Sequence, residues 1–275
     1  EALVASARNG YKIILSKGYY IDLMQPTAYH YLNDPSPKNN TEIVPDSEAD
    51  FDRFESSIME GIKTGKLSFT PQEESLIMGG EATMWTEHVT EETLDGRIWP
   101  RTAAIAERLW SPASVRDVND VYDRLDDISR RLEWVGSRHE TNRWMMMRRL
   151  ADEADVEPMM RVVNLLEPVK GYKRNAKDAL TKFYPYTEIA DIAIADPPAL
   201  REFNRLVDSV NKGHKKEWMD RMNVSTSRWV DDFQVIQDRF RSHSRLLPLY
   251  NHAAFLAMLA GSIKEGNGYA MKKVH

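Results

Sequence analysis

The chain has 275 residues, of which 42% are hydrophobic, enough to bury a core in one large domain or two smaller ones. Its formal net charge of -5, with lysines and arginines scattered among acids, argues against nucleic-acid binding, and its lack of cysteine excludes disulfides, thiol catalysis and thiolate zinc sites. No unbroken apolar run approaches the roughly 18 residues of a membrane span, so no span is expected.

The first 137 residues alternate strand and helix patterns. The expected elements are, in chain order, a helix at 1–10, a buried strand at 11–16, a loop with prolines and asparagines at 25–40, a helix at 51–63, a strand at 76–87, and helices at 100–110 and 115–135. Strand followed by helix, repeated, is typical of a parallel α/β fold. The chain opens without Met or a signal-peptide pattern, partway through an amphipathic helix, and we therefore expect a piece of a longer protein.

The rest of the chain is nearly free of strand patterns. Prolines separate its apolar segments, and helices are expected at 144–147, 159–166, 176–183, 200–210 and 229–240. We interpret the methionines at 145–147 as core residues rather than a binding surface, because Met readily fills gaps in a core. The expected division is 1–137 and 138–275, with the second part an all-α helical domain.

The segment 76–111 combines a glycine pair, a tryptophan and several acids. Gly79 and Gly80 allow a backbone or a ligand to approach closely. Thr83, Trp85 and Glu87 share one face of an extended strand. A ring beside a carboxylate suits a sugar, since the ring covers the apolar face and the carboxylate accepts from hydroxyls. A core Trp beside a solvated Glu is the alternative interpretation.

Tyr20 and Asp22 follow the first apolar strand. They are two residues apart, so their side chains point the same way, about 7 Å apart along an extended chain. A rim tyrosine and a turn-capping aspartate would fit the same pattern. Glu81 and Glu87 would lie roughly 20 Å apart on an extended strand, too far to be the paired carboxylates of a conventional glycosidase.

No metal or cofactor is expected. The acids around His88 indicate a solvated turn, because a second well-spaced histidine is missing. Ion pairs that close the fold are the expected role of three charged residues, Arg101, Glu107 and Arg108.

Three motifs carry a resemblance to a known family. GGEATMWTEHV and RIWPRTAAIAERLWS resemble the closing strand and helix of the catalytic barrel in family 20 glycoside hydrolases, the β-N-acetylhexosaminidases. IILSKGYYIDL is similar to the preceding barrel strand of that family. The resemblance covers roughly residues 1–137. It implies an α/β fold in which about two βα units form the C-terminal part of a (β/α)8 TIM barrel, followed by the helical domain.

The resemblance also implies a role for each candidate site residue. Tyr20 is expected to be catalytic and to donate its hydroxyl to the acetamido oxygen of the substrate. Asp22 and Glu87 are expected to bind sugar hydroxyls, and Trp85 to form a wall of the pocket. The implied reaction is retaining and substrate-assisted: the acetamido oxygen attacks the anomeric carbon, and a Glu protonates the leaving group.

The family's adjacent Asp-Glu pair has no convincing counterpart in this chain. The one such dipeptide, Asp152-Glu153, lies in a helical context beyond the barrel, so we expect the general acid to be absent and the isolated chain to be inactive. The expected partner is an N-acetylhexosamine-containing oligosaccharide or glycoconjugate, with self-association through unpaired barrel edges. The resemblance favours an extracytoplasmic location. The alternative is a non-catalytic carbohydrate-binding or assembly module.

Overall fold

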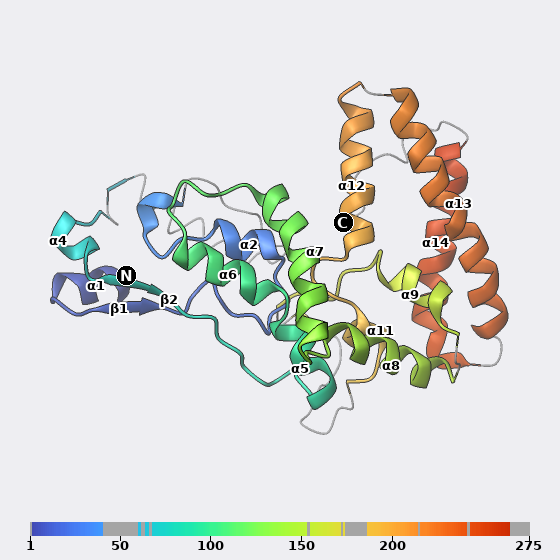
Figure 1. The fold of residues 1–275 in the computed structure, drawn as a ribbon, viewed down its shortest axis with the longest axis horizontal. Helices are drawn as coiled ribbons and strands as arrows, with labels where there is room; N and C mark the ends of the chain where they lie inside the picture. Colours follow the sequence, from blue (N-terminus) through green and yellow to red (C-terminus); the bar gives the residue numbers. More distant parts are fainter. Residues whose placement is uncertain are drawn as a thin grey trace. The chain divides into compact units, whose positions relative to one another are not determined.

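The computed structural model describes a chain of two compact units (Figure 1). The described residues are 2–40, 60–61, 64–65, 68–152, 155–171, 173, 186–213, 215–240 and 243–264. Residues 1–139 and 169–184 form the first unit, and residues 140–168 and 185–275 form the second. The predicted helices at 51–63 and 176–183 lie outside the described residues, apart from residues 60 and 61. The expected division into domains 1–137 and 138–275 stays a prediction.

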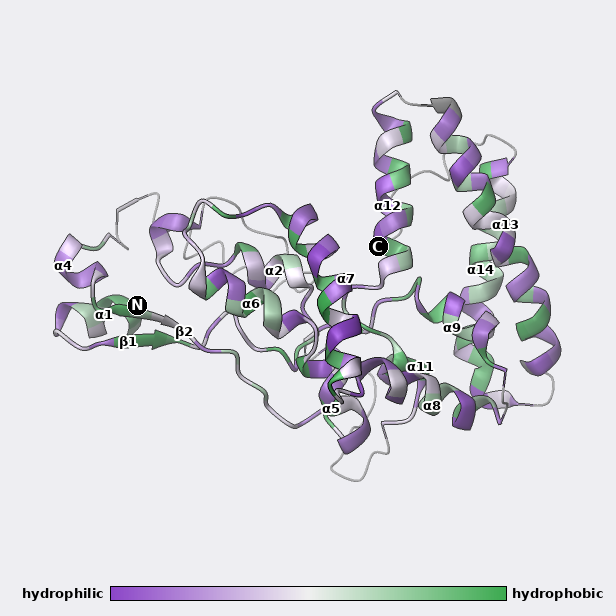
Figure 2. Ribbon diagram, viewed as in Figure 1, coloured by the Kyte–Doolittle hydropathy of each residue, from purple (hydrophilic) through white to green (hydrophobic). Residues whose placement is uncertain are grey.

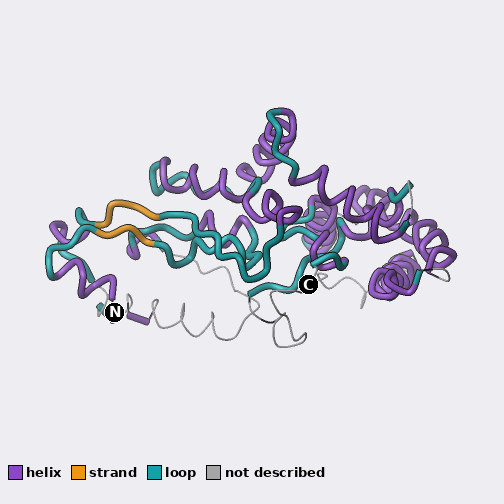
Figure 3. The backbone as a smooth tube through the Cα atoms, turned by 90° about the horizontal axis from the view of Figure 1, so that it is seen from below, coloured by secondary structure: helices purple, strands orange, loops and turns teal. Residues whose placement is uncertain are grey.

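The first unit is built on two parallel strands, β1 (Ile13–Leu15) and β2 (Ile77–Gly80), drawn in orange in Figure 3. Helix α1 (Ala2–Arg8) precedes β1. Between Ile13 and Ile14 the register shifts, because β2 has one extra residue there. Both strands are shorter than the predicted ranges of 11–16 and 76–87.

The strands are also less buried than expected. The side chains of Ile14 and Met78 are 62% and 58% exposed. The sheet of the described residues has two strands, and so small a sheet leaves apolar surface uncovered. The prediction that the strand at 11–16 would be buried was therefore wrong.

Further helical elements lie in the described part of the first unit. They are α2 (Thr27–Leu32), the 3-10 turn η1 (Pro37–Asn39), α4 (Pro71–Glu74), α5 (Glu91–Ile98), α6 (Arg101–Trp110) and α7 (Val118–Trp134). Tyr31 of α2, Ala104 of α6 and Leu125 of α7 belong to one buried cluster. The expected helices at 100–110 and 115–135 are confirmed as α6 and α7.

Three helices of the first unit, α2, α4 and α5, were not predicted. The segment 25–40, expected to be a loop, contains α2 and η1, because Pro26 precedes the first helical residue, where a proline is tolerated. The segment after Val89, expected to be a solvated turn, begins α5. A capping box between Thr90 and Thr93 satisfies the first amides of that helix.

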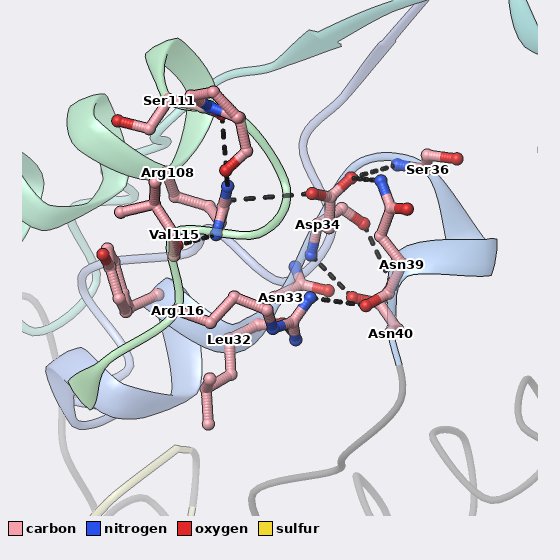
Figure 4. A network of polar contacts seen from close by, with 12 residues as sticks. Leu32, Asn33, Asp34, Ser36, Asn39, Asn40, Arg108, Ser111, Val115 and Arg116 are labelled. Carbon is pink, nitrogen blue, oxygen red and sulfur yellow. Dashed lines mark hydrogen bonds and ion pairs between the residues drawn. The ribbon is translucent and has the colours of Figure 1, made fainter.

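A network of polar contacts fixes the segment after α2 to the loop after α6 (Figure 4). Arg108 is buried and lies 3.8 Å from the Asp34 carboxylate. Its guanidinium donates to the backbone carbonyls of Ser111, Pro112 and Val115. Arg116 donates to the carbonyls of Leu32 and Asn39. Two arginines thus satisfy carbonyls that no regular element pairs.

The described residues of the second unit form helices. They are α8 (His139–Ala151, whose first residue belongs to the first unit), α9 (Glu157–Val163), α11 (Ile189–Ile192), α12 (Pro198–Asn211), α13 (Lys215–Phe240), the 3-10 turn η2 (Ser244–Leu246) and α14 (Leu247–Lys264). Helix α13 packs against both α12 and α14. Met146 and Met147 are buried in the core, which confirms the interpretation as packing residues for these two. The same interpretation was wrong for Met145, which is 41% exposed.

Helix α14 is the apolar element that the sequence reasoning missed (Figure 2, green). Ser244–Lys264 is long and apolar enough to cross a membrane by length and composition, with a mean hydropathy of 1.4 and 33% of the window buried. The expectation of no membrane span stays a prediction, because length and composition alone do not show that a helix crosses a membrane. Core helices of soluble proteins can meet the same criterion, and Leu249, Leu256 and Ile263 belong to the core of this unit.

Replacing Gly80 by Ala should destabilise the first unit by about 1–3 kcal/mol, the cost of overpacking a filled site. A Cβ atom there would lie 2.6 Å from the buried Tyr19 ring and 3.0 Å from the Leu15 carbonyl oxygen. Gly96→Ala is the matched control. Its Cβ meets nothing closer than 3.9 Å, and helix propensity predicts a gain of up to about 1 kcal/mol. Urea unfolding followed by circular dichroism measures both variants, and equal effects would contradict the prediction.

Candidate functional site

The candidate site lies just beyond β1 and β2, where the two segments that follow these strands pair through backbone hydrogen bonds. Tyr20 pairs with Thr83, the Thr83 amide donates to the Tyr19 carbonyl at 2.9 Å, and the Ile21 amide donates to the Thr83 carbonyl at 3.0 Å. This pairing places the segment after β1 beside the segment after β2. The predicted site residues on both segments are therefore close together.

Tyr20 and Trp85 are in direct ring contact. Their centroids are 6.5 Å apart and the planes meet at 85°, an edge-to-face arrangement of the kind that aromatic pairs favour. The Trp85 side chain is 53% exposed, so its ring is held by a neighbour and still open to solvent. Such an indole can accept the apolar face of a ligand without rearranging.

Asp22 is the buried acid of the site, with 4% of its surface exposed. Burial raises the pKa of its carboxyl above the usual value, and the nearby Glu87 charge raises it further. The backbone amides of Asp22 and Trp85 donate to the carboxylate and lower the pKa, as does the Arg101 charge. Burial is the largest of these effects. Within the described residues, the Oδ1 atom of Asp22 has no hydrogen-bond partner.

Glu87 is exposed, in contrast to Asp22. The structure brings the four predicted residues into one neighbourhood, since Tyr20 contacts Trp85, and Asp22 interacts with the Trp85 amide and with the charge of Glu87. A stackable ring, a phenol and two carboxylates can together bind a polyhydroxylated ring. The role of each residue stays a prediction.

Arg101 bonds to three backbone carbonyls, and the ion pair expected of it stays a prediction. Its guanidinium is 3% exposed and donates to the carbonyls of Ile21, Gln25 and Arg97, at 2.6, 2.8 and 2.6 Å. The other two expected pairs are confirmed: Glu107 with Arg124, and Arg108 with Asp34. The sequence did not predict that Arg101 would hold the backbone of Ile21 and Gln25, because every residue carries a carbonyl and no pattern marks these two as partners.

His30 holds the turn that precedes Tyr20. The sequence did not predict this function of His30. Its fully buried ring has Nδ1 at 2.8 Å from the Gly18 carbonyl oxygen, so Nδ1 carries the proton and donates. Burial, with a contribution from Arg101, lowers the pKa of His30 to about 3. The ring is therefore neutral near pH 7. Gly18 has a φ of +90°, and a Cβ there would collide with the Asn33 side chain, so this turn requires glycine.

Glu81 lies outside this group and makes a contact between the two strand segments. The Ser16 hydroxyl donates to its carboxylate at 2.5 Å. The described residues contain no cluster of three or more His, Asp or Glu side chains that could hold a metal ion.

Comparison with known proteins gives matches at both the sequence and the structure level. The catalytic domain of glycosyl hydrolase family 20 matches residues 1–113. The β-hexosaminidase subunit beta of Sus scrofa is 34% identical over 125 residues, which cover 46% of this chain and 18% of the relative. The same subunit of Homo sapiens is 50% identical over 56 residues, which cover 20% of this chain and 10% of the relative.

A solved structure extends the similarity over the helices. The chitobiase of Flavobacterium johnsoniae superposes with a TM-score of 0.80 at 31% identity, over 97% of this chain and 37% of the chitobiase. The match therefore continues beyond residue 137, where the sequence resemblance ends. It agrees with a portion of a TIM barrel followed by helices. The chain spans 18% or less of the length of the two curated relatives above.

Replacing Asp22 by Asn should stabilise the fold at neutral pH. Because the folded pKa is raised, the folded state holds the proton more tightly than the unfolded state. The buried charge therefore costs stability above the folded pKa and costs nothing below the unfolded value of 3.8. The gain from Asp22→Asn should shrink as pH falls toward that value.

Urea unfolding of both proteins across the acid range measures this difference. Subtracting the two curves removes the contribution of His30, which acts in the opposite direction because its folded pKa is lowered. A gain that stays constant with pH would contradict the proposed cost of the buried carboxylate.

Proposed function

Because this chain belongs to glycosyl hydrolase family 20, we propose that it forms the C-terminal part of the catalytic barrel of a β-N-acetylhexosaminidase, about two βα units, with a helical region after it. The complete enzyme would hydrolyse terminal β-linked N-acetylglucosamine or N-acetylgalactosamine. One observation carries the proposal: a buried carboxylate, one oxygen of which has no hydrogen-bond partner within the described residues, lies beside an exposed indole in edge-to-face contact with a tyrosine.

In this proposal each site residue meets a different part of the sugar. Trp85 covers the apolar face of the sugar ring, since Trp85 is 53% exposed and its indole is held in edge-to-face contact with Tyr20. Asp22 accepts hydrogen bonds from outer hydroxyls through Oδ1. Glu87, exposed at the rim, accepts from the hydroxyls near C4 and C6. Tyr20 donates its hydroxyl to the acetamido oxygen.

The proposed reaction is substrate-assisted and retains configuration. The acetamido oxygen attacks the anomeric carbon as the glycosidic bond breaks, and an acid protonates the departing oxygen. An oxazolinium ion results, and water then attacks the same carbon from the side that the leaving group left. Tyr20 stabilises the charge that develops on the acetamido group, a preorganised electrostatic contribution.

We infer that the general acid comes from outside these 275 residues. The one Asp-Glu dipeptide of the sequence is Asp152-Glu153, and Asp152 belongs to the second unit, where its carboxylate lies 4.0 Å from His243. Glu153 lies outside the described residues. The exposed Ile14 and Met78 support the further proposal that other barrel strands cover this sheet, or that isolated chains self-associate through it.

Removing the indole should weaken sugar binding. Trp85→Ala should lower the affinity for N-acetylglucosamine roughly tenfold, the equivalent of about 1.4 kcal/mol of lost ring contact. Trp110→Ala is the matched control, because Trp110 is 92% exposed in the same unit and outside the site. Isothermal titration calorimetry of wild type and both variants measures the difference. Equal affinity of the Trp85 variant and the wild type would remove Trp85 from the pocket.

Hydrolysis should require residues beyond this chain. A chromogenic β-N-acetylglucosaminide should be cleaved by a protein extended upstream through further barrel strands, and not by the 275 residues alone at equal concentration. Activity of the short chain would place the acid inside it. Sugar binding without hydrolysis by either protein would favour a non-catalytic carbohydrate-binding or assembly module.

A further inference from the structure

We infer that Arg101 is a positioning residue for Asp22: one buried guanidinium fixes the backbone on both sides of the sugar-binding carboxylate and places a positive charge near it. This inference rests on the proposed function, because it takes Asp22 to bind the sugar. Arg101 acts on Asp22 in two ways, a geometric part through hydrogen bonds and an electrostatic part through its charge.

The geometry of Arg101 spans the segment that carries Asp22. Nη2 donates to the Ile21 carbonyl at 2.6 Å, immediately before Asp22, and Nη1 donates to the Gln25 carbonyl at 2.8 Å, after it. Nη2 also donates to the Arg97 carbonyl at 2.6 Å, in the last turn of α5. The guanidinium therefore joins the ends of α5 and α6 to residues 21–25. Since Met24 has a φ of +59°, this segment needs such external support.

A lysine could not reproduce this arrangement. The guanidinium is planar, with donors in a fixed fork that reaches separate acceptors at once, whereas an ammonium is a compact group on a flexible stem. Replacing Arg101 by Lys keeps a positive charge and removes the fork. Replacing it by Met removes both. The two variants thus separate geometry from charge.

Two charged groups act on the Asp22 carboxyl, and two further titratable groups lie on the neighbouring helices α2 and α5. Arg101 on α6 lowers the pKa of its carboxyl, and Glu87 after β2 raises it. His30 on α2 lies in the field of Arg101 and is neutral near pH 7. Arg97 on α5 points its guanidinium at the Met24 sulfur, at 2.7 Å. Burial and the Glu87 charge raise the pKa of Asp22, and the Arg101 charge lowers it. Without the Arg101 charge the pKa should rise, so Asp22 should take up its proton at higher pH.

Arg108 is a matched control on the same helix. It is also buried, at 2% exposure, and also donates to three backbone carbonyls, but these belong to Ser111, Pro112 and Val115 after α6 (Figure 4). A Lys or Met at position 108 causes comparable damage to a buried arginine without touching the segment of Asp22. Effects shared by both positions are general losses of stability.

The first measurement needs no sugar. The titration of the Asp22 carboxyl is followed by carbon-13 NMR, assigned with Asp22→Asn, in wild type, Arg101→Met and Arg108→Met. The midpoint should move to higher pH in Arg101→Met and stay in place in Arg108→Met. An unchanged midpoint in a folded Arg101→Met protein would overturn the electrostatic part.

The second measurement is the affinity for N-acetylglucosamine as a function of pH. Arg101→Lys should bind roughly tenfold more weakly with an unmoved pH midpoint, because the charge stays and the fork is lost. Arg108→Lys should bind like the wild type. Wild-type affinity in Arg101→Lys would overturn the geometric part, and this milder variant carries the test if Arg101→Met does not fold. Failure of the wild type to bind would contradict the proposed function, while the carboxyl titration would still test Arg101.

Discussion

The backbone ladder between residues 13–21 and 76–83 is the constraint on which the site depends. Amides of Ile13, Ile21, Glu81 and Thr83 donate across it at 2.8 to 3.0 Å. These bonds join segments far apart in the chain, and they set which residue after β1 faces which residue after β2. A slip of one residue would turn every side chain to the other face. The contact of Tyr20 with Trp85, and that of Asp22 with the Trp85 amide, follow from this register.

The glycines of the strand ends make the ladder possible. Gly80 lets the Tyr19 ring and the Leu15 carbonyl approach β2, and Gly18 provides the positive φ that brings Tyr19 and Tyr20 into place. Helix α2 and its C-cap residue hold this turn through two hydrogen bonds. The His30 ring donates to the Gly18 carbonyl, and the Tyr19 hydroxyl donates to the Asn33 carbonyl at 3.0 Å. The site is thus held from both strand segments and from the helix that follows the first.

The buried carboxylate of Asp22 costs stability that the surrounding fold must offset. Such a cost is typical of binding sites, where a preorganised polar group is kept from water until a ligand satisfies it. Two buried arginines of α6 stabilise different parts of the first unit. Arg101 holds the segment of Asp22, and Arg108 joins Asp34 to the loop after α6 (Figure 4). Their positive charges are tolerated in the interior because carbonyl oxygens surround them.

The sequence by itself determined the parallel strand pair, helices α6 and α7 and most helices of the second unit, because spacing, glycines and capping residues are local signals. Spacing paired Tyr20 with Asp22 and Trp85 with Glu87, and the family resemblance of the motifs joined the two pairs in one candidate site. The sequence did not reveal α2, α4, α5, α11 or α14, whose patterns are short or lack a polar face. Only the tertiary structure decided that Arg101 serves Asp22 and that His30 holds Gly18. Both side chains bond to carbonyl oxygens, which are identical in every residue, so no sequence pattern marks the partner, and only folding brings it near.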